Sequence, residues 1–256
     1  MSAPVIHWFR RDLRLADNPA LAAAAGAPVI PLFVLDDETP GRRPLGGAGR
    51  WWLHHALRSL EEDLRRLGSA LVLRRGRAED VVARLAEESG ARAVHFARGH
   101  APGDAETERR LGEVVGARGV ECRRFAGALL VEPDAVKTRT GGPFRVFTPF
   151  YRACRGLRIE APLPPPARLT APTEWPASQR LDDWSLLPSR PDWSGGLGET
   201  WEVGEAAAQR RLDAFVDEML AGYAVQRDRP AVAGTSRLSP HLGFGEIGPR
   251  TCWHRV

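Results

Sequence analysis

The sequence predicts a doubly wound α/β domain, then a long linker, then the beginning of an all-helical domain. Three observations lead to this fold class. Short apolar runs alternate with helical patterns over roughly the first 130 residues, a stretch rich in proline and glycine follows, and a new amphipathic helix begins after Gly204. Strands and helices in strict succession are typical of a parallel sheet with right-handed crossovers. We therefore divide the chain into residues 1–130, 131–204 and 205–256, the last being an incomplete helical domain.

Five segments have the pattern of strands. They are VIHWF at 5–9, PVIPLFVLD at 28–36, ALVLRR at 70–75, AVHFA at 93–97 and ECRRF at 121–125. The first four are dense enough in apolar residues to predict burial on both faces, which is typical of a parallel sheet.

Two of the intervening helices have readable ends. Asn18 followed by Pro19 predicts a helix start, with a capping side chain and then a proline at the first helical position. From Leu53 onward the apolar residues keep a helical spacing until Gly68, which ends that helix.

A ligand of such a sheet is expected beyond the carboxyl ends of the strands, near Arg10, Arg11, Asp36 and Asp37. No GxGxxG follows the first strand, so the usual dinucleotide fingerprint is absent.

Residues 160–204 contain many prolines and glycines without periodicity, which predicts an extended linker. The helix that follows carries an apolar stripe, for which only residues 227–256 remain as a packing surface. Its members, at i, i+3, i+4, i+7 and i+8, are Leu212, Phe215, Val216, Met219 and Leu220.

Composition indicates a soluble, cytoplasmic protein. The chain of 256 residues is 43% hydrophobic, has no apolar run of membrane-spanning length and shows no secretion signal at its N-terminus. Its cysteines, Cys122, Cys154 and Cys252, are far apart and odd in number, which favours reduced thiols and predicts no metal site. Residues 137–159 contain six basic residues and no acidic one. This stretch is either a polyanion-binding surface or a solvated face.

The segment GTSRLSPHLGFGEIGPR at 234–250 has the chemistry of a phosphate site. Thr235, Ser236 and Ser239 supply hydroxyls, Arg237 supplies a cation, and Ser239 with Pro240 predicts a helix start. Hydroxyls, a cation and the positive end of a helix suit a phosphate or pyrophosphate. Any turn rich in serine and threonine before a helix has the same pattern, so the residues alone leave both interpretations open.

Three separate segments resemble the DNA photolyase and cryptochrome family, in the family's order. They are HWFRRDLRLADNPAL at 7–21, FRVFTPFYRA at 144–153 and GYAVQRDRPAVAGTSRLSPHLGFGEIGPR at 222–250. The resemblance implies a Rossmann-like domain that binds an antenna pigment, followed by the opening of a helical FAD-binding domain. In this family most of the flavin cavity and the lesion pocket come from later helices, so the resemblance covers about the first half of a family member.

The resemblance also implies roles for single residues. Tyr223 would contact FAD, and Arg227 would face the DNA backbone, although an ion pair with Asp228 is its alternative role. The flavin diphosphate would be held by Thr235, Ser236, Arg237, Leu238 and Ser239. In the family, light-excited reduced FAD donates an electron to a pyrimidine dimer flipped out of the duplex. No side chain of this chain is therefore expected to act as a catalytic group.

The resemblance leaves the antenna pigment open. Folate-binding members use an asparagine–glutamate pair after the fourth strand. This sequence has GHAPGDAETERR there, without an asparagine, and its only asparagine is Asn18. This departure favours a deazaflavin or a flavin, or an empty pocket. Arg10, Asp36 and Arg50 are the candidate pocket residues, and each is equally plausible as part of a surface ion pair.

The leading functional hypothesis is a monomeric photolyase that repairs cyclobutane pyrimidine dimers in DNA. A signalling cryptochrome and a photolyase for the (6-4) lesion are alternatives within the family. A nucleotide-binding or interaction module without repair activity is an alternative of another class, but it leaves the segment at 235–239 unexplained.

Overall fold

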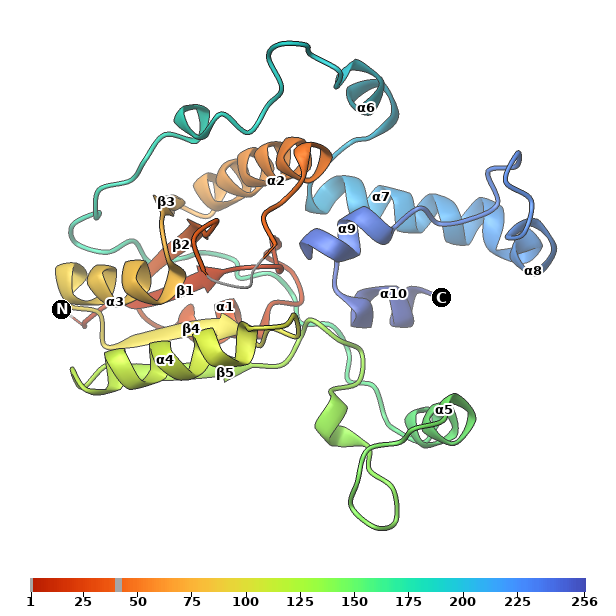
Figure 1. Ribbon diagram of the computed structural model, residues 1–256, viewed down its shortest axis with the longest axis horizontal. Coiled ribbons are helices and arrows are strands. Elements are labelled where there is room, and N and C mark those ends of the chain that lie inside the picture. Colours follow the sequence, from red (N-terminus) through yellow and green to blue (C-terminus); the bar gives the residue numbers. More distant parts are fainter. Residues whose placement is uncertain (1, 40–42) are drawn as a thin grey trace.

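A five-stranded parallel sheet forms the centre of the protein. The computed structural model describes residues 2–39 and 43–256. The strand order is β3-β2-β1-β4-β5, and each neighbouring pair is parallel (Figure 1). The strands are β1 (Val5–Phe9), β2 (Val29–Leu35), β3 (Val72–Arg75), β4 (Ala93–Ala97) and β5 (Glu121–Phe125). This arrangement confirms the predicted doubly wound α/β fold.

Burial decreases from the centre of the sheet to its edges. Every residue of β1, β2 and β4 is buried, as the apolar runs predict. The prediction is wrong for the second half of β3, where Val72 and Leu73 are buried but Arg74 and Arg75 are not. The reason is that β3 is an edge strand, so its end has no neighbouring strand on one side.

Helices cover both faces of the sheet. One apolar cluster joins α1 (Pro19–Ala24) and α2 (Gly47–Arg66) to one face. A second cluster joins α3 (Ala78–Ser89) and α4 (Asp104–Gly116) to the other face. Asn18 caps α1 as predicted, since its side chain accepts a hydrogen bond from the backbone N–H of Leu21 at 3.1 Å. Helix α2 begins at Gly47 rather than at Leu53, and its first turns bury Trp51 and Trp52.

The segment at 160–204 is extended, as predicted, but it also packs against the α/β domain. The N–H of Leu169 donates to the carbonyl of Leu67 at 3.1 Å, and the N–H of Gln179 donates to the carbonyl of Leu73 at 2.9 Å. Its short helical elements are a 3-10 turn (Leu181–Trp184) and α6 (Gly195–Thr200). Its buried apolar side chains, which join the α1/α2 cluster, are Leu169, Leu181, Trp184 and Leu186.

Ahead of this segment lie a 3-10 turn (Pro133–Ala135) and α5 (Phe147–Arg155). Helix α5 stands apart from the sheet in Figure 1, and no residue in it is buried.

The last part of the chain is helical. Helix α7 (Glu205–Ala214) continues through a π-helical turn (Phe215–Met219) and a 3-10 turn (Leu220–Gly222) into α8 (Tyr223–Gln226), and α9 (Ser239–Phe244) and α10 (Pro249–Arg255) follow. Residues 227–256 supply a packing surface for two members of the apolar stripe, Leu212 and Val216. A third cluster forms there from Ala208, Leu212, Leu238 and Ile247, with Val216 and Cys252 packed against it.

Arg14 joins the helical part to the α/β domain. Its buried guanidinium donates hydrogen bonds to the carbonyls of Asp17, Gly127 and Gly245 at 2.9, 3.0 and 3.0 Å. Gly245 has a left-handed φ of +73°, and a Cβ there would collide with the carbonyl of Arg11. Only glycine therefore allows this close approach of the two backbones.

Two carboxylates add further contacts across the same boundary. Glu205 accepts hydrogen bonds from the backbone N–H groups of Leu15 and Ala16 at 2.6 and 2.9 Å. Asp17, which is buried, forms an ion pair with the partly exposed Arg250. Within residues 2–39 and 43–256, no helix combines the length and apolar composition needed to span a bilayer.

Candidate functional site

The loop at 235–239 is the last part of the connection between α8 and α9 and includes Ser239, the first residue of α9. It is fixed at both ends. At its start Gly234 is buried against Gln226 of α8, so that a Cβ at position 234 would overlap the Gln226 side chain. At its other end Leu238 is 5% exposed and belongs to the third apolar cluster. Between these anchors, Arg237 has a left-handed φ of +52°.

The loop presents its hydroxyl groups to solvent. Thr235 and Ser239 are exposed, and Ser236 is partly exposed. In the part of the chain that the structure describes, none of the three hydroxyls has a hydrogen-bond partner. The expectation that Ser239 caps α9 is wrong, because Leu238 occupies the cap position and no side chain accepts a hydrogen bond there. The three hydroxyls are therefore available to a ligand.

Two guanidinium groups lie against one tryptophan beside this loop. The guanidinium carbon of Arg237 lies 4.5 Å from the ring centroid of Trp201, and that of Arg211 lies 5.0 Å from it. Arg211 and Trp201 were not among the predicted site residues. They precede the loop by more than 20 residues and belong to no motif, so only the folded structure reveals them.

Trp201 is itself held by a buried group of aromatic and polar side chains. The ring of Trp52 meets that of Trp201 edge to face at 5.4 Å, and the ring of His241 lies 6.4 Å from it. His241 Nδ1 and Glu246 Oε2 are 2.5 Å apart, and Glu246 Oε1 accepts a hydrogen bond from the Trp52 indole N–H at 3.0 Å. The side chains of His241 and Glu246 are completely buried, so this hydrogen-bonded group holds the Trp201 ring in a fixed position.

Tyr223 is the first residue of α8, and Arg227 directly follows that helix. The Tyr223 ring meets that of Phe215 edge to face at 5.6 Å, and the guanidinium carbon of Arg227 lies 5.3 Å from the Tyr223 ring centroid. Arg227 Nε is 3.6 Å from an Asp228 carboxylate oxygen, so the alternative ion pair is present. Arg227 is exposed and remains accessible to a ligand as well.

Arg10 lies at the carboxyl end of β1, where the strand order reverses. Its guanidinium pairs with Asp104 at 2.8 Å and with Glu108, and it donates to the Ala97 carbonyl at 3.2 Å. The Arg10 side chain is 9% exposed. It belongs to a largely buried ion-pair network at the carboxyl ends of β1 and β4, and not to a surface ion pair.

Asp36 and Arg50 lie beyond the carboxyl end of β2. The Asp36 carboxylate accepts hydrogen bonds from the Thr39 hydroxyl at 2.6 Å and from the backbone N–H of Ala78 at 3.2 Å. Burial opposes ionisation there, but these and two further backbone hydrogen bonds lower the pKa of Asp36 below its usual value. Arg50 pairs with Asp37 at 2.8 Å, and Arg10 contacts neither Asp36 nor Arg50.

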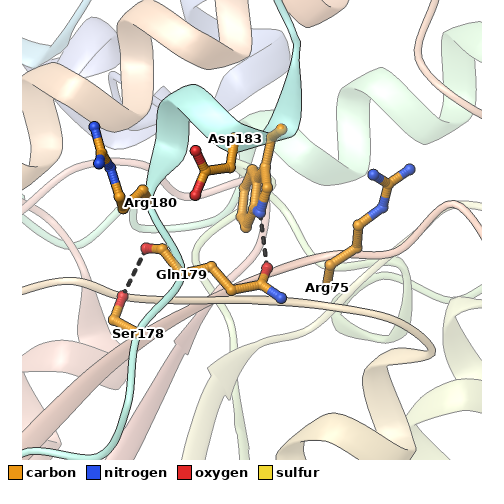
Figure 2. A pocket seen from close by; sticks show the side chains of 6 residues that line it. Arg75, Ser178, Gln179, Arg180 and Asp183 are labelled. Atoms are coloured by element: carbon orange, nitrogen blue, oxygen red, sulfur yellow. Dashed lines mark hydrogen bonds between the residues drawn. The ribbon is translucent and has the colours of Figure 1, made fainter.

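A pocket of about 340 Å³ opens beside the end of β3. Arg75 and Arg180 stand at opposite ends of it, and Asp183 lies between them (Figure 2). The Trp184 indole N–H closes one wall by donating to the Gln179 side chain at 2.8 Å. Arg75 also lies 3.5 Å from Asp37, which links the pocket to Arg50. No group of three or more His, Cys, Asp or Glu side chains with metal-binding geometry occurs among the described residues.

Comparison with known proteins places the chain in a family. Residues 5–167 match the DNA photolyase family. The deoxyribodipyrimidine photo-lyase of Agrobacterium fabrum is 46% identical over 99% of this chain and 53% of its own length. Cryptochrome-1 of Arabidopsis thaliana is 36% identical over 98% of this chain and 37% of its own length.

A solved structure agrees with these relatives. The class III photolyase from Agrobacterium tumefaciens superposes on all of this chain with a TM-score of 0.94 and 45% identity, over 53% of its own chain. The chain spans about half the length of the photolyases it matches. The resemblance found in the three sequence segments is thus confirmed, and the chain belongs to the DNA photolyase family.

Proposed function

We propose that the protein repairs cyclobutane pyrimidine dimers in DNA in a light-dependent reaction with reduced FAD as the electron donor. The observation that carries the proposal is the exposed hydroxyl loop at 235–239, in a chain that is 46% identical to a deoxyribodipyrimidine photo-lyase along its length. Residues 205–256 would form the first part of the FAD-binding domain, after an antenna-binding domain at 1–130 and a connecting segment at 131–204. The rest of the length found in the relatives would complete the flavin cavity.

The loop fits the diphosphate of FAD. Thr235, Ser236 and Ser239 offer three hydroxyl donors without internal partners, and Arg237 adds a positive charge. Leu238 would contribute through its backbone, because its side chain is buried in the third apolar cluster. Hydrogen bonds between charged phosphates and such donors are roughly twice as strong as neutral ones.

Tyr223 would contact the flavin from α8, which packs against the start of the loop through Gln226. Bound reduced flavin would supply the light-driven electron that splits the cyclobutane ring, so no residue of this chain needs to act as an acid, a base or a nucleophile. The role of these residues is to bind and orient the cofactor.

The partner would be DNA that contains pyrimidine dimers, bound by a monomer. Arg227 is exposed beside Tyr223 and would contact a backbone phosphate. A cytoplasmic location belongs to the same proposal, because thiols such as those of Cys122 and Cys252 stay reduced there.

A second, antenna chromophore would bind beyond the carboxyl ends of β2 and β3. Arg50 is a quarter exposed there, and Asp36 shapes the adjoining loop through its hydrogen bonds. Arg10 would affect the chromophore only indirectly, because its guanidinium is engaged in the buried ion-pair network beside β4. The absent asparagine–glutamate pair favours a deazaflavin or a flavin over a folate. Extraction and chromatography of the bound pigment identifies it, and Arg50→Ala should lower the antenna content without removing FAD. Recovery of a folate would contradict the proposed class.

A cryptochrome-type photoreceptor is the second candidate, because the chain is also 36% identical to Cryptochrome-1 of Arabidopsis thaliana. The deciding experiment uses protein expressed from the complete reading frame. It is illuminated with blue light on DNA that carries either cyclobutane dimers or (6-4) lesions, and matched samples are kept in the dark. We expect light-dependent loss of the cyclobutane dimers only. Repair of the (6-4) lesion only, or of neither lesion, would contradict the proposal.

A further inference from the structure

Arg211 has no ion-pair partner among the described residues, although the carboxylate of Glu202 acts on it from a greater distance. Arg211 lies on α7, and its guanidinium carbon is 5.0 Å from the Trp201 ring centroid. Among residues 2–39 and 43–256, no carboxylate lies within ion-pair distance of Arg211 or of Arg237. The neighbouring Arg210, in contrast, pairs with Glu202 at 2.6 Å. Both arginines of α10 likewise have acidic partners, Arg250 with Asp17 and Arg255 with Asp213 at 2.7 Å.

The fold brings these two unpaired guanidiniums together on one indole. Arg211 comes from α7 and Arg237 from the hydroxyl loop, and both lie against the ring of Trp201. Burial, followed by the positive charge of Arg237, lowers the pKa of Arg211 below its usual value. Like charges that act on each other are stabilised by an anion bound near both, so these two guanidiniums point to an anionic ligand.

The indole that carries both guanidiniums is fixed in position. Trp201 rests edge to face on Trp52, and Trp52 donates its indole N–H to the buried Glu246. Glu246 is bonded in turn to His241. A cation that is stacked on a rigid ring loses little freedom when it binds an anion, which suits a preorganised binding site.

We propose that Arg211 and Arg237 form a clamp on the diphosphate of FAD, with Trp201 as its support. The proposal rests on the proposed function, and it extends the phosphate site from the loop to α7. A diphosphate carries two adjacent negative charges, and two guanidiniums match them with paired hydrogen bonds. A DNA phosphate is the competing anion. The flavin is favoured because Arg237 belongs to the same loop as Thr235, Ser236 and Ser239.

The test compares FAD with riboflavin, which has the same ring system but no diphosphate. Protein from the complete reading frame is stripped of flavin and titrated with each ligand. Arg211→Gln removes the guanidinium and with it the proposed contact. Arg211→Met removes the same group but keeps an apolar stem. Arg210→Gln is the matched control one residue away. We expect both Arg211 variants to bind FAD at least about tenfold more weakly and riboflavin within about twofold of the unmodified protein. Arg210→Gln should change neither affinity.

Three results would overturn the clamp. The first is unchanged FAD affinity in both Arg211 variants, and the second is an equal loss for FAD and riboflavin, which indicates a general structural role. The third is weaker DNA binding with a shallower salt dependence while FAD affinity is unchanged, which assigns Arg211 to DNA.

The joint variant Thr235→Ala, Ser236→Ala, Ser239→Ala distinguishes a failure of the clamp from a failure of the proposed FAD site. If that variant loses FAD while the Arg211 variants keep it, only the clamp is wrong. If it keeps FAD, the proposed diphosphate site is wrong, and the clamp falls with it.

Discussion

Replacement of Arg14 by methionine should detach the helical part from the α/β domain. Arg14 is 2% exposed, and its guanidinium donates hydrogen bonds to three backbone carbonyls. Methionine keeps much of the volume but has no donor, so the carbonyls of Asp17, Gly127 and Gly245 lose a partner. The buried carboxylate of Asp12 also loses a nearby positive charge.

The expected destabilisation is large for a single substitution. Removing one member of a buried charged network typically costs about 3–5 kcal/mol, out of a total stability of roughly 5–15 kcal/mol for a folded domain. Urea unfolding followed by tryptophan fluorescence measures this loss. Hydrogen exchange should show that amides of α9 and α10 lose protection before those of β1 and β4, because Gly245 lies directly after α9.

Arg11→Met is the matched control for this prediction. Arg11 is the exposed neighbour in the same loop, and surface substitutions usually change stability by less than about 0.5 kcal/mol. If Arg14→Met unfolds within about 1 kcal/mol of Arg11→Met, the argument that Arg14 joins the two parts is refuted.

Three further predictions follow from other contacts. Arg227→Ala should weaken binding to lesion DNA and leave the flavin in place, and it should flatten the log–log salt dependence by about 0.9 for the phosphate lost; an unchanged slope would leave Arg227 with only its ion pair to Asp228. Trp52→Phe should cost about 1–3 kcal/mol in urea unfolding, because the buried Glu246 oxygen loses its donor; a neutral effect would show that the oxygen finds another partner. Burial, together with the charge of His95, lowers the pKa of His7 from 6.5 to about 3, so the unfolded chain takes up this proton at a higher pH than the folded protein. The contribution of His7 to the free energy of unfolding should therefore be complete above about pH 6.5 and fall by up to about 1.4 kcal/mol per pH unit from there down to about pH 3. His7→Leu should reduce that slope, and an identical slope in the two proteins would assign it to other groups.

The strands were the most predictable part of the fold. The bounds of β1 and β4 agree with the apolar runs at 5–9 and 93–97, and β5 has the bounds predicted for the more polar segment at 121–125. Buried strands of a parallel sheet need continuous apolar sequence, and that need leaves a clear signal. The start of α2 was missed because its cap residue, Gly46, offers no side chain that marks a helix start.

Contacts between distant segments left no such signal. Arg10, Arg11 and Arg14 follow one another closely in the sequence, yet Arg10 pairs with α4, Arg11 is exposed and Arg14 reaches Gly245. The partners and the exposure of these three side chains depend on which distant segment packs against each of them, and the local sequence does not contain that information. The same holds for Arg211, whose place beside the hydroxyl loop arises only when α7 and Leu238 of that loop share one apolar cluster.

We propose above that the loop at 235–239 holds the flavin that drives repair. The most direct test is the molar ratio of FAD to protein after gel filtration, for protein from the complete reading frame and for its variant with Thr235, Ser236 and Ser239 all changed to alanine. Each lost bond to a charged phosphate should cost on the order of 1.5–3 kcal/mol, so three losses exceed what a bound cofactor can withstand during purification. We predict a ratio near one for the unmodified protein and near zero for the variant. Equal ratios in the two proteins would show that this loop does not hold the flavin.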